Sequence, residues 1–113
     1  MTVINTIPAL TIDVHSQEVL VRGGLSGPAI KPVALRAVYE VSGAVDVPVI
    51  GSGGVMSGLD VAEFMLAGAT AVQVGTASFV RDPREILDEF ANYLDKEELG
   101  AADLTGGLQE IRS

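Results

Sequence analysis

One pattern occurs twice between residues 47 and 79 and constrains the fold more than any other feature: a short strand followed by a glycine turn. Residues 47–50 are apolar and β-branched, as in a strand buried on both faces, and residues 71–74 predict a second buried strand. Between them, residues 57–60 form a capping box that begins a helix, and Gly68 is placed to end it. This order predicts parallel pairing, which brings both glycine turns to one edge of the sheet.

The two glycine turns are the first candidates for a binding site. Gly51-Ser52-Gly53-Gly54 follows the first strand and Gly75-Thr76 the second. Because glycine has no Cβ, backbone N–H groups in such turns can approach a ligand closely. The first turn is not the dinucleotide fingerprint, whose third glycine would fall on Met56, and alone it is as consistent with tight packing as with phosphate binding. Two such turns at one edge favour an anion, most simply a phosphate.

The remaining residues predict further elements on both sides of this stretch. Residues 2–6 form a strand, residues 8–21 alternate as in a small hairpin, and residues 23–28 form a glycine-rich loop. Pro32 begins the next helix, and after Asp82 a proline and a glutamate open the last one. The buried face of that last helix would comprise Ile86, Leu87, Phe90, Tyr93 and Leu94.

The order of these elements predicts a parallel sheet with right-handed crossovers. Three strands are too few to close a barrel, and an open sheet this small would leave two apolar edges unpaired. A complete barrel needs about 250 residues, so we predict the C-terminal portion, about strands 6 to 8, of a TIM (β/α)8 barrel, incomplete in this chain. Residues 1–113 would form one partial β/α-barrel domain: strand, hairpin and glycine-rich loop in 1–32, β/α units in 33–99, and a weakly ordered tail with one short helical turn in 100–113.

Composition excludes several classes of function. Fifteen acidic and seven basic residues give a net charge of −8, which argues against nucleic acid or an anionic membrane as a partner. The chain has no cysteine, so it holds no disulfide, thiolate nucleophile or cysteine-ligated iron–sulfur cluster, and a single histidine argues against bound zinc. Glycine, aspartate or glutamate interrupts the longest apolar runs, so we predict no signal peptide, no membrane span and a cytoplasmic protein.

Few side chains outside the glycine turns point to chemistry. Asn5 and Thr6 would lie where the first strand ends; they could contact a substrate or cap the following turn, and local reasoning favours the cap. Lys31 and Arg36 could steer an anion, but solvation at the surface is the simpler interpretation, and His15 is expected to be exposed at the hairpin tip. No carboxylate pair and no Ser/His/Asp set has a catalytic spacing, so the residues alone predict no catalytic residue and no metal site.

Four longer motifs occur in one order along the chain: Ile4-Asn5-Thr6, Gly24-Leu25-Ser26-Gly27-Pro28-Ala29-Ile30-Lys31-Pro32, Pro48-Val49-Ile50-Gly51-Ser52-Gly53-Gly54 and Ala67-Gly68-Ala69-Thr70-Ala71-Val72-Gln73-Val74-Gly75-Thr76-Ala77. In this order and at these spacings they resemble the C-terminal part of dihydroorotate dehydrogenase, and most of all the class 1 enzymes of the B type. The resemblance extends over nearly the whole chain to about Leu94.

The resemblance implies a fold, a cofactor and a reaction. Members of that family are β/α barrels that hold FMN at the C-terminal ends of their strands and oxidise dihydroorotate to orotate in de novo pyrimidine (UMP) biosynthesis. In the B type, a second subunit with FAD and a [2Fe–2S] cluster passes the electrons to NAD. By position, Asn5 and Thr6 would contact the substrate. The FMN contacts would come from Ile4, Gly27, Gly53, Gly54, Gly75 and Thr76.

The chain also departs from the family. The general-base cysteine, a lysine near the flavin and several substrate asparagines lie on earlier strands there, so the resemblance assigns no catalytic residue to this chain. The segment between Asp13 and Gly23 is a few residues shorter than usual. The flavin domain of dihydropyrimidine dehydrogenase shares the fold, but Gly75-Thr76-Ala77 fits dihydroorotate dehydrogenase better.

Three hypotheses follow from these observations. The first is the C-terminal part of a dihydroorotate dehydrogenase, from a truncated or split gene, which needs the N-terminal half of the barrel. The second is a stand-alone half-barrel that binds a phosphate or flavin ligand without redox activity, paired with itself or with another half. The third is an inactive fragment. Unpaired strand edges would in each case favour an oligomer.

Overall fold

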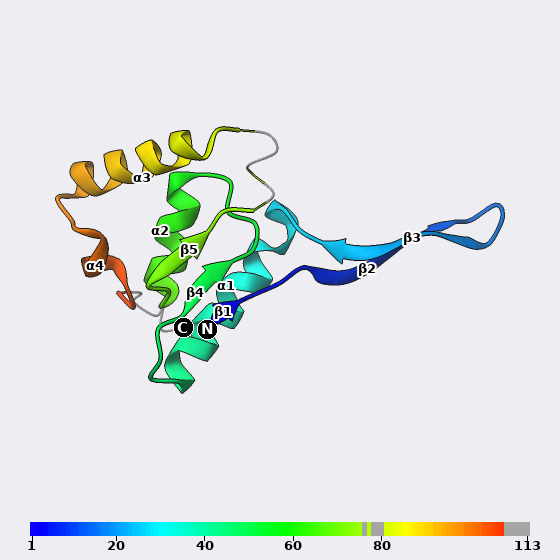
Figure 1. The fold of residues 1–113 in the computed structure, drawn as a ribbon, viewed down its shortest axis with the longest axis horizontal. Coiled ribbons are helices and arrows are strands. Elements are labelled where there is room, and N and C mark those ends of the chain that lie inside the picture. Colours follow the sequence, from blue (N-terminus) through cyan, green and yellow to red (C-terminus); the bar gives the residue numbers. More distant parts are fainter. Residues whose placement is uncertain (76, 78–80, 108–113) are drawn as a thin grey trace, which may run out of the picture.

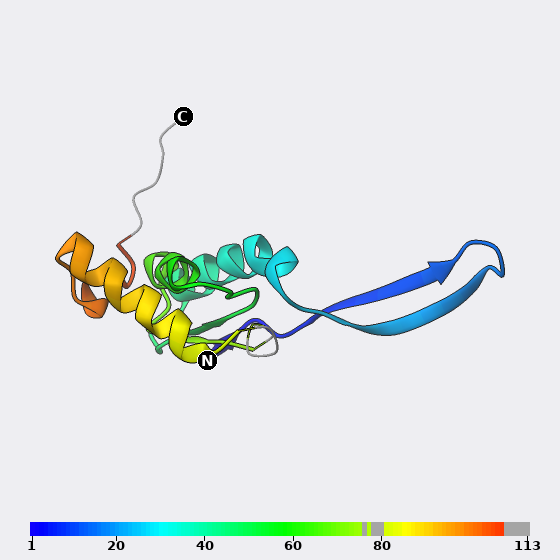
Figure 2. The ribbon, with the colours of Figure 1, turned by 90° about the horizontal axis from the view of Figure 1, so that it is seen from above.

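Figure 1 shows the computed structural model of the chain, which describes residues 1–75, 77 and 81–107. A three-stranded parallel sheet forms its centre, helices lie against the sheet, and a two-stranded antiparallel hairpin projects away from it (Figures 1 and 2). The alternation of strands and helices predicted from the sequence is confirmed, and the chain has an α/β fold with a parallel sheet.

The three parallel strands end together at one edge of the sheet. Their order is β1 (Thr2–Val3), β4 (Ile50–Ser52) and β5 (Ala71–Gln73). In the register of the sheet, Val3 lies opposite Gly51, and the last residues of β4 and β5 lie opposite each other. The loops that follow the three strands therefore emerge side by side.

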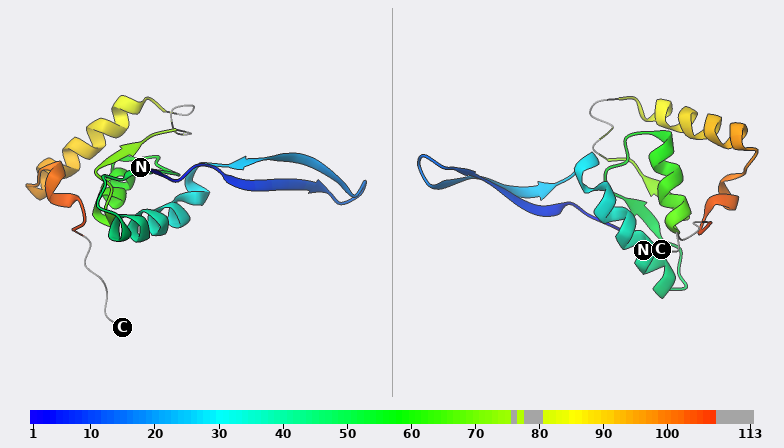
Figure 3. Two further views of the ribbon diagram at one scale, coloured as in Figure 1. Left: turned by 60° about the horizontal axis from the view of Figure 1, so that its bottom comes forward. Right: turned by 180° about the vertical axis from the view of Figure 1, so that it is seen from behind.

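Helices cover one face of this sheet. Helices α1 and α2 pack on it, and α3 packs against α2 (Figures 1 and 3). A 3₁₀ turn, η1, leads directly into α1. The bounds are η1 (Pro28–Ile30), α1 (Lys31–Ala44), α2 (Gly58–Ala67), α3 (Pro83–Glu97) and α4 (Ala101–Leu104).

The main core lies between the sheet and α1 and α2. Phe64, Val38 and Val49 are almost completely buried there. A Cβ atom added to Gly51 would lie 2.7 Å from the ring of Phe64, so this glycine is required for packing. Gly51 thus belongs to the strand and its packing, and the turn that can face a ligand is confined to Gly53 and Gly54.

Strand β4 lies further along the chain than the apolar pattern predicts. Residues 47–50 were expected to be the strand, but it spans Ile50–Ser52, and Val47 is 54% exposed. Pro48 has no N–H to donate to a neighbouring strand. The ladder therefore begins at Ile50, whose N–H donates to the carbonyl oxygen of Met1 at 2.7 Å.

Two predictions of burial are wrong. Ala71 and Gln73 of β5 are exposed, because none of the described elements covers the face of the sheet opposite α1 and α2. In α3, Leu87 is 65% exposed whereas Ile86 is 2% exposed. Leu87 is rotated by about 100° around the helix from Ile86, so it does not share the buried side on which Ile86 lies.

The predicted hairpin is present and is longer than expected. It consists of β2 (Ile7–Asp13) and β3 (Glu18–Leu25), so β3 includes part of the predicted glycine-rich loop. His15 is exposed at its tip, as predicted. The side chains of Leu10 and Ile12 are each more than half exposed, which leaves apolar surface along this arm.

The helix ends follow the local sequence signals. The hydroxyl of Ser57 accepts a hydrogen bond from the N–H of Asp60 at 3.3 Å, and Asp82 caps α3 by accepting from the N–H of Arg84 at 2.9 Å. Gly68 follows α2 with a φ of 132°, a conformation that favours glycine. The predicted short helical turn in the tail is α4. None of the helices in the described part of the chain has the length and apolar character needed to cross a bilayer.

The sheet has two open edges among the described residues, because β1 and β5 each pair only with β4. Open apolar strand edges pair readily with other chains. We expect a polypeptide of these 113 residues, expressed alone, to form oligomers or aggregates despite its net charge of −8. Size-exclusion chromatography with light scattering measures this directly. A monodisperse monomer with a sharp, cooperative thermal transition would contradict the expectation.

Candidate functional site

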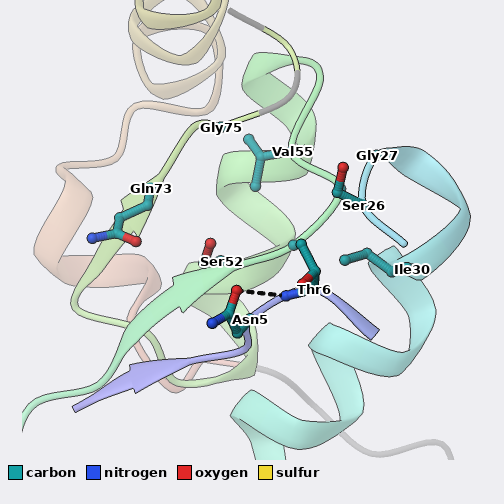
Figure 4. A pocket seen from close by; sticks show the side chains of 11 residues that line it. Asn5, Thr6, Ser26, Gly27, Ile30, Ser52, Val55, Gln73 and Gly75 are labelled. Atoms are coloured by element: carbon teal, nitrogen blue, oxygen red, sulfur yellow. Dashed lines mark hydrogen bonds between the residues drawn. The ribbon is translucent and has the colours of Figure 1, made fainter. Parts of the chain in front are cut away.

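A hollow of about 290 Å³ lies at the edge of the sheet where the three parallel strands end (Figure 4). It is formed by the segments that follow β1, β4 and β5, together with the segment that leads into η1. Those segments are far apart in the sequence, and the sheet brings them together. Six of the residues predicted to bind a cofactor or a substrate line this strand-end hollow: Asn5, Thr6, Gly27, Gly53, Gly54 and Gly75.

Two residues that were predicted to bind the cofactor, Ile4 and Thr76, are not among the described residues that line the hollow. Ile4 does not line the hollow; it is half-buried, packs against the core, and its N–H donates to the carbonyl oxygen of Ser52 at 2.8 Å. A Cβ atom on Gly53 would lie 3.4 Å from the side chain of Ile4, so Ile4 supports the turn from behind. Thr76 lies outside the described residues.

Sequence reasoning assigned no ligand contact to five further residues that line the hollow, although one of them, Ser52, lies within the first glycine turn. The serines that directly precede Gly27 and Gly53 would have been detectable, and so would Gln73, a polar residue at an alternate position of an otherwise apolar strand. The two apolar residues gave no signal of their own, because their positions depend on how the loops pack. The five are Ser26, Ile30, Ser52, Val55 and Gln73.

The turn after β4 requires glycine for steric reasons. Gly53 has a φ of 131° and Gly54 a φ of 76°, in the region where other residues are strained. A Cβ atom on Gly54 would lie 2.7 Å from the carbonyl oxygen of Gly27 and 2.9 Å from the backbone nitrogen of Lys31. The turn after β4 and the entry to α1 are thus in backbone contact. The N–H of Gly54 donates to no acceptor in the described part of the chain.

Asn5 combines a local role with a place in the hollow. Its side-chain oxygen accepts a hydrogen bond from the N–H of Thr6 at 2.7 Å (Figure 4). This is the turn-capping role that local reasoning favoured. Both residues are exposed and line the hollow, so the cap leaves them at the same edge as the glycine turns.

No charged side chain is among the described residues that line the hollow. Lys31 lies close behind the hollow, and the prediction that it is simply solvated is wrong. Its ammonium lies 2.7 Å from Asp60 Oδ1 and 3.1 Å from Glu63 Oε1. The hydrogen bond to Asp60 raises the pKa of Lys31. Burial acts to raise the pKa of Asp60, but its hydrogen bonds from Lys31 and from the N–H of Met56 outweigh burial and lower that pKa.

Two further predictions concern Arg36, expected to be solvated, and the expectation that the chain has no metal site. Arg36 is at the surface, with its side chain 81% exposed and paired to Glu40 one helical turn on. Within the described ranges, no group of three or more His, Cys, Asp or Glu side chains is placed to hold a metal ion. The hollow can therefore act through backbone N–H groups, hydroxyls and amides rather than through charge.

Sequence comparisons match the chain to one enzyme family. A family model described as dihydroorotate dehydrogenase matches residues 1–96. The catalytic subunits of dihydroorotate dehydrogenase B (NAD(+)) from Geobacter metallireducens and Petrotoga mobilis are 52% and 48% identical over 116 and 117 residues. A putative dihydroorotate dehydrogenase A (fumarate) from Solibacter usitatus is 47% identical over 115 residues. These alignments cover 96%, 99% and 96% of this chain, but only 38%, 37% and 38% of the three relatives.

A solved structure agrees with the sequence comparisons. The crystal structure of dihydroorotate dehydrogenase from Eimeria tenella, in complex with ferulenol, superposes with a TM-score of 0.76 and 32% sequence identity. The superposition covers 94% of this chain and 30% of that chain. The chain therefore spans less than two fifths of the length of each of these four proteins.

Proposed function

Because the chain belongs to the dihydroorotate dehydrogenase family, we propose that it supplies the C-terminal portion, about strands 6 to 8, of a TIM barrel that oxidises dihydroorotate to orotate in pyrimidine biosynthesis. The family implies a flavin, which we take to be FMN. In this proposal residues 1–113 are one partial barrel domain, with β/α units in 33–99 between the strand, hairpin and loop of 1–32 and the tail of 100–113.

One observation carries this proposal: the strand-end hollow joins two glycine-containing turns at the C-terminal edge of a parallel sheet. In β/α barrels this edge carries the active site, and the last two loops commonly bind phosphate. The open face and the two open edges of the sheet are what an arc cut from a closed barrel would present. They support the barrel assignment, because the missing strands would cover both edges.

The hollow fits the phosphate end of FMN. The Gly53–Gly54 turn keeps the space that a Cβ atom would fill, and the N–H of Gly54 has no acceptor among the described residues. In the proposal this turn, Gly27 and the Gly75-Thr76 turn hold the phosphate, with Ile4 behind them. Asn5 and Thr6 bind the polar edge of the substrate by hydrogen bonds. Bound FMN would accept a hydride from dihydroorotate.

The electron acceptor is proposed from the names of the relatives. Several are catalytic subunits of dihydroorotate dehydrogenase B (NAD(+)), so we propose a partner subunit that carries FAD and a [2Fe–2S] cluster. The Solibacter usitatus relative is named for fumarate instead. Assays of the assembled protein with NAD⁺ and with fumarate distinguish the two acceptors.

A complementation experiment tests the proposed function. The chain is co-expressed with the part of the Geobacter metallireducens catalytic subunit that it does not match, and the copurified complex is analysed for bound flavin and, with an artificial electron acceptor, for orotate formation. We expect a complex that retains FMN and turns over dihydroorotate. A complex that assembles without flavin contradicts the proposal. Flavin retention with no turnover would favour the stand-alone binding module instead.

A further inference from the structure

The loops that form the strand-end hollow are tied together behind it by a buried carboxylate. Asp60, in the first turn of α2, is only 9% exposed. Its Oδ1 accepts from the ammonium of Lys31 at 2.7 Å, and its Oδ2 accepts from the N–H of Met56 at 2.9 Å. Lys31 begins α1, and Met56 follows the Gly53–Gly54 turn by two residues. One side chain thus joins the entry to α1 to the loop after β4.

A second side chain, that of Arg81, holds Met56 by its carbonyl oxygen. Arg81 precedes α3, and its Nη1 donates to the carbonyl oxygen of Met56 at 3.0 Å. The same nitrogen lies 3.1 Å from Glu89 Oε1, which also accepts from the N–H of Gly58 at 3.1 Å. The hydrogen bond from Gly58, together with Arg81, lowers the pKa of Glu89, so this pair stays charged at neutral pH. Arg81 therefore joins the loop after β4 to the segment between β5 and α3.

We propose that Asp60 and Arg81 are positioning residues: by holding the N–H and the carbonyl oxygen of Met56, they fix the Gly53–Gly54 turn and set how tightly the hollow holds a phosphate. The inference rests on the proposed function for the identity of the ligand. It concerns two residues that are not among those lining the hollow.

We call this restraint of Met56 by Asp60 and Arg81 the clamp. The physical reason for it is the conformational freedom of the Gly53–Gly54 turn. Consecutive glycines lose more conformational entropy on ordering than other residues, so an unrestrained turn would have to be ordered by the ligand. Ordering it in advance leaves more of the interaction free energy for affinity. Val55, between the turn and Met56, is 3% exposed, so the restraint at Met56 is transmitted through a packed residue.

The test uses the complex of the complementation experiment and two variants, Asp60→Asn and Arg81→Gln. FMN and riboflavin, which lacks the phosphate, are titrated by flavin fluorescence. We expect each variant to weaken FMN binding roughly tenfold, about one hydrogen bond to a charged group, and to leave riboflavin binding unchanged. Arg36→Gln is the matched control for Arg81→Gln. Each substitution removes an ion pair between an arginine and the glutamate four residues further on, but in the described structure Arg36 forms no hydrogen bond with Met56.

Two readouts separate positioning from general stability. A variant that weakens FMN and riboflavin equally, or weakens neither, overturns the inference. Hydrogen exchange at the amides of residues 53–58 should be faster in both variants than in Arg36→Gln, and equal exchange would also overturn it. If the unsubstituted complex binds FMN no better than riboflavin, the proposed phosphate site fails, whereas hydrogen exchange still decides the clamp. If Asp60→Asn does not assemble, Arg81→Gln carries the test, since its side chain is part-exposed.

Discussion

Gly54→Ala is expected to weaken FMN retention in the assembled barrel by roughly ten- to a hundred-fold for each phosphate hydrogen bond lost. The added Cβ atom would lie 2.7 Å from the carbonyl oxygen of Gly27. The alanine would also have to adopt a φ of 76°, which is strained for any residue with a Cβ atom. Two of its three nearest atoms, the carbonyl oxygen of Gly27 and the nitrogen of Lys31, belong to the backbone, so they cannot rotate away as a side chain could. The turn would therefore move, and the N–H of Gly54 would move with it away from the proposed phosphate position.

Gly43→Ala provides the matched control for this substitution. Gly43 is an exposed residue near the end of α1, and a Cβ atom there would contact nothing within 4 Å. Alanine is about 1 kcal/mol more favourable than glycine inside a helix, so the control should not loosen the protein. Flavin dissociation followed by fluorescence measures both variants. Equal retention of FMN by the two variants would show that the turn does not hold the phosphate.

Lys31→Ala provides a comparison based on charge. The ammonium of Lys31 faces Asp60 and Glu63, and Lys31 does not line the hollow, so its loss should release less FMN than Gly54→Ala. If Lys31→Ala released the flavin while Gly54→Ala held it, the assignment of the glycine turn as the phosphate site would be wrong.

Features set by neighbouring residues in the chain could be predicted from the sequence. Ser57 and Asp82 cap their helices, and Gly68 ends α2, because each acts on backbone groups within a few residues of itself. Gly53, Gly54 and Gly75 were identified for a related reason: they follow closely on apolar stretches that predict strands, and a glycine there lets backbone N–H groups approach a ligand.

Features set by distant residues could not be predicted in this way. The start of β4 depends on the carbonyl oxygen of Met1, which accepts a hydrogen bond from the N–H of Ile50, so the apolar pattern alone placed the strand too early. Lys31 and Asp60 are 29 residues apart, and no local pattern indicates that α1 and α2 bring them into contact. The exposure of Ala71 likewise depends on what covers the open face of the sheet.

A polypeptide of these 113 residues is expected to oxidise dihydroorotate at least 10²–10⁴-fold more slowly than the assembled barrel. Oxidation requires a base that removes one hydrogen as a proton while the flavin accepts the other as a hydride. None of the described residues that line the strand-end hollow has a titratable side chain, and the chain has no cysteine to serve as the general base of the family. Loss of a positioned base alone accounts for this range.

The measurement is orotate formation by the isolated chain with added FMN and an artificial electron acceptor, beside the complex of the complementation experiment under the same conditions. Only the complex contains the strands on which the family carries its base, so it reports the rate that the hollow supports once a base is present. Turnover by the isolated chain at about 1 s⁻¹ or faster, typical of enzymes, would contradict the prediction. Such turnover would require a proton acceptor within these 113 residues. The one histidine, His15, is exposed at the hairpin tip and is not among the residues that line the hollow.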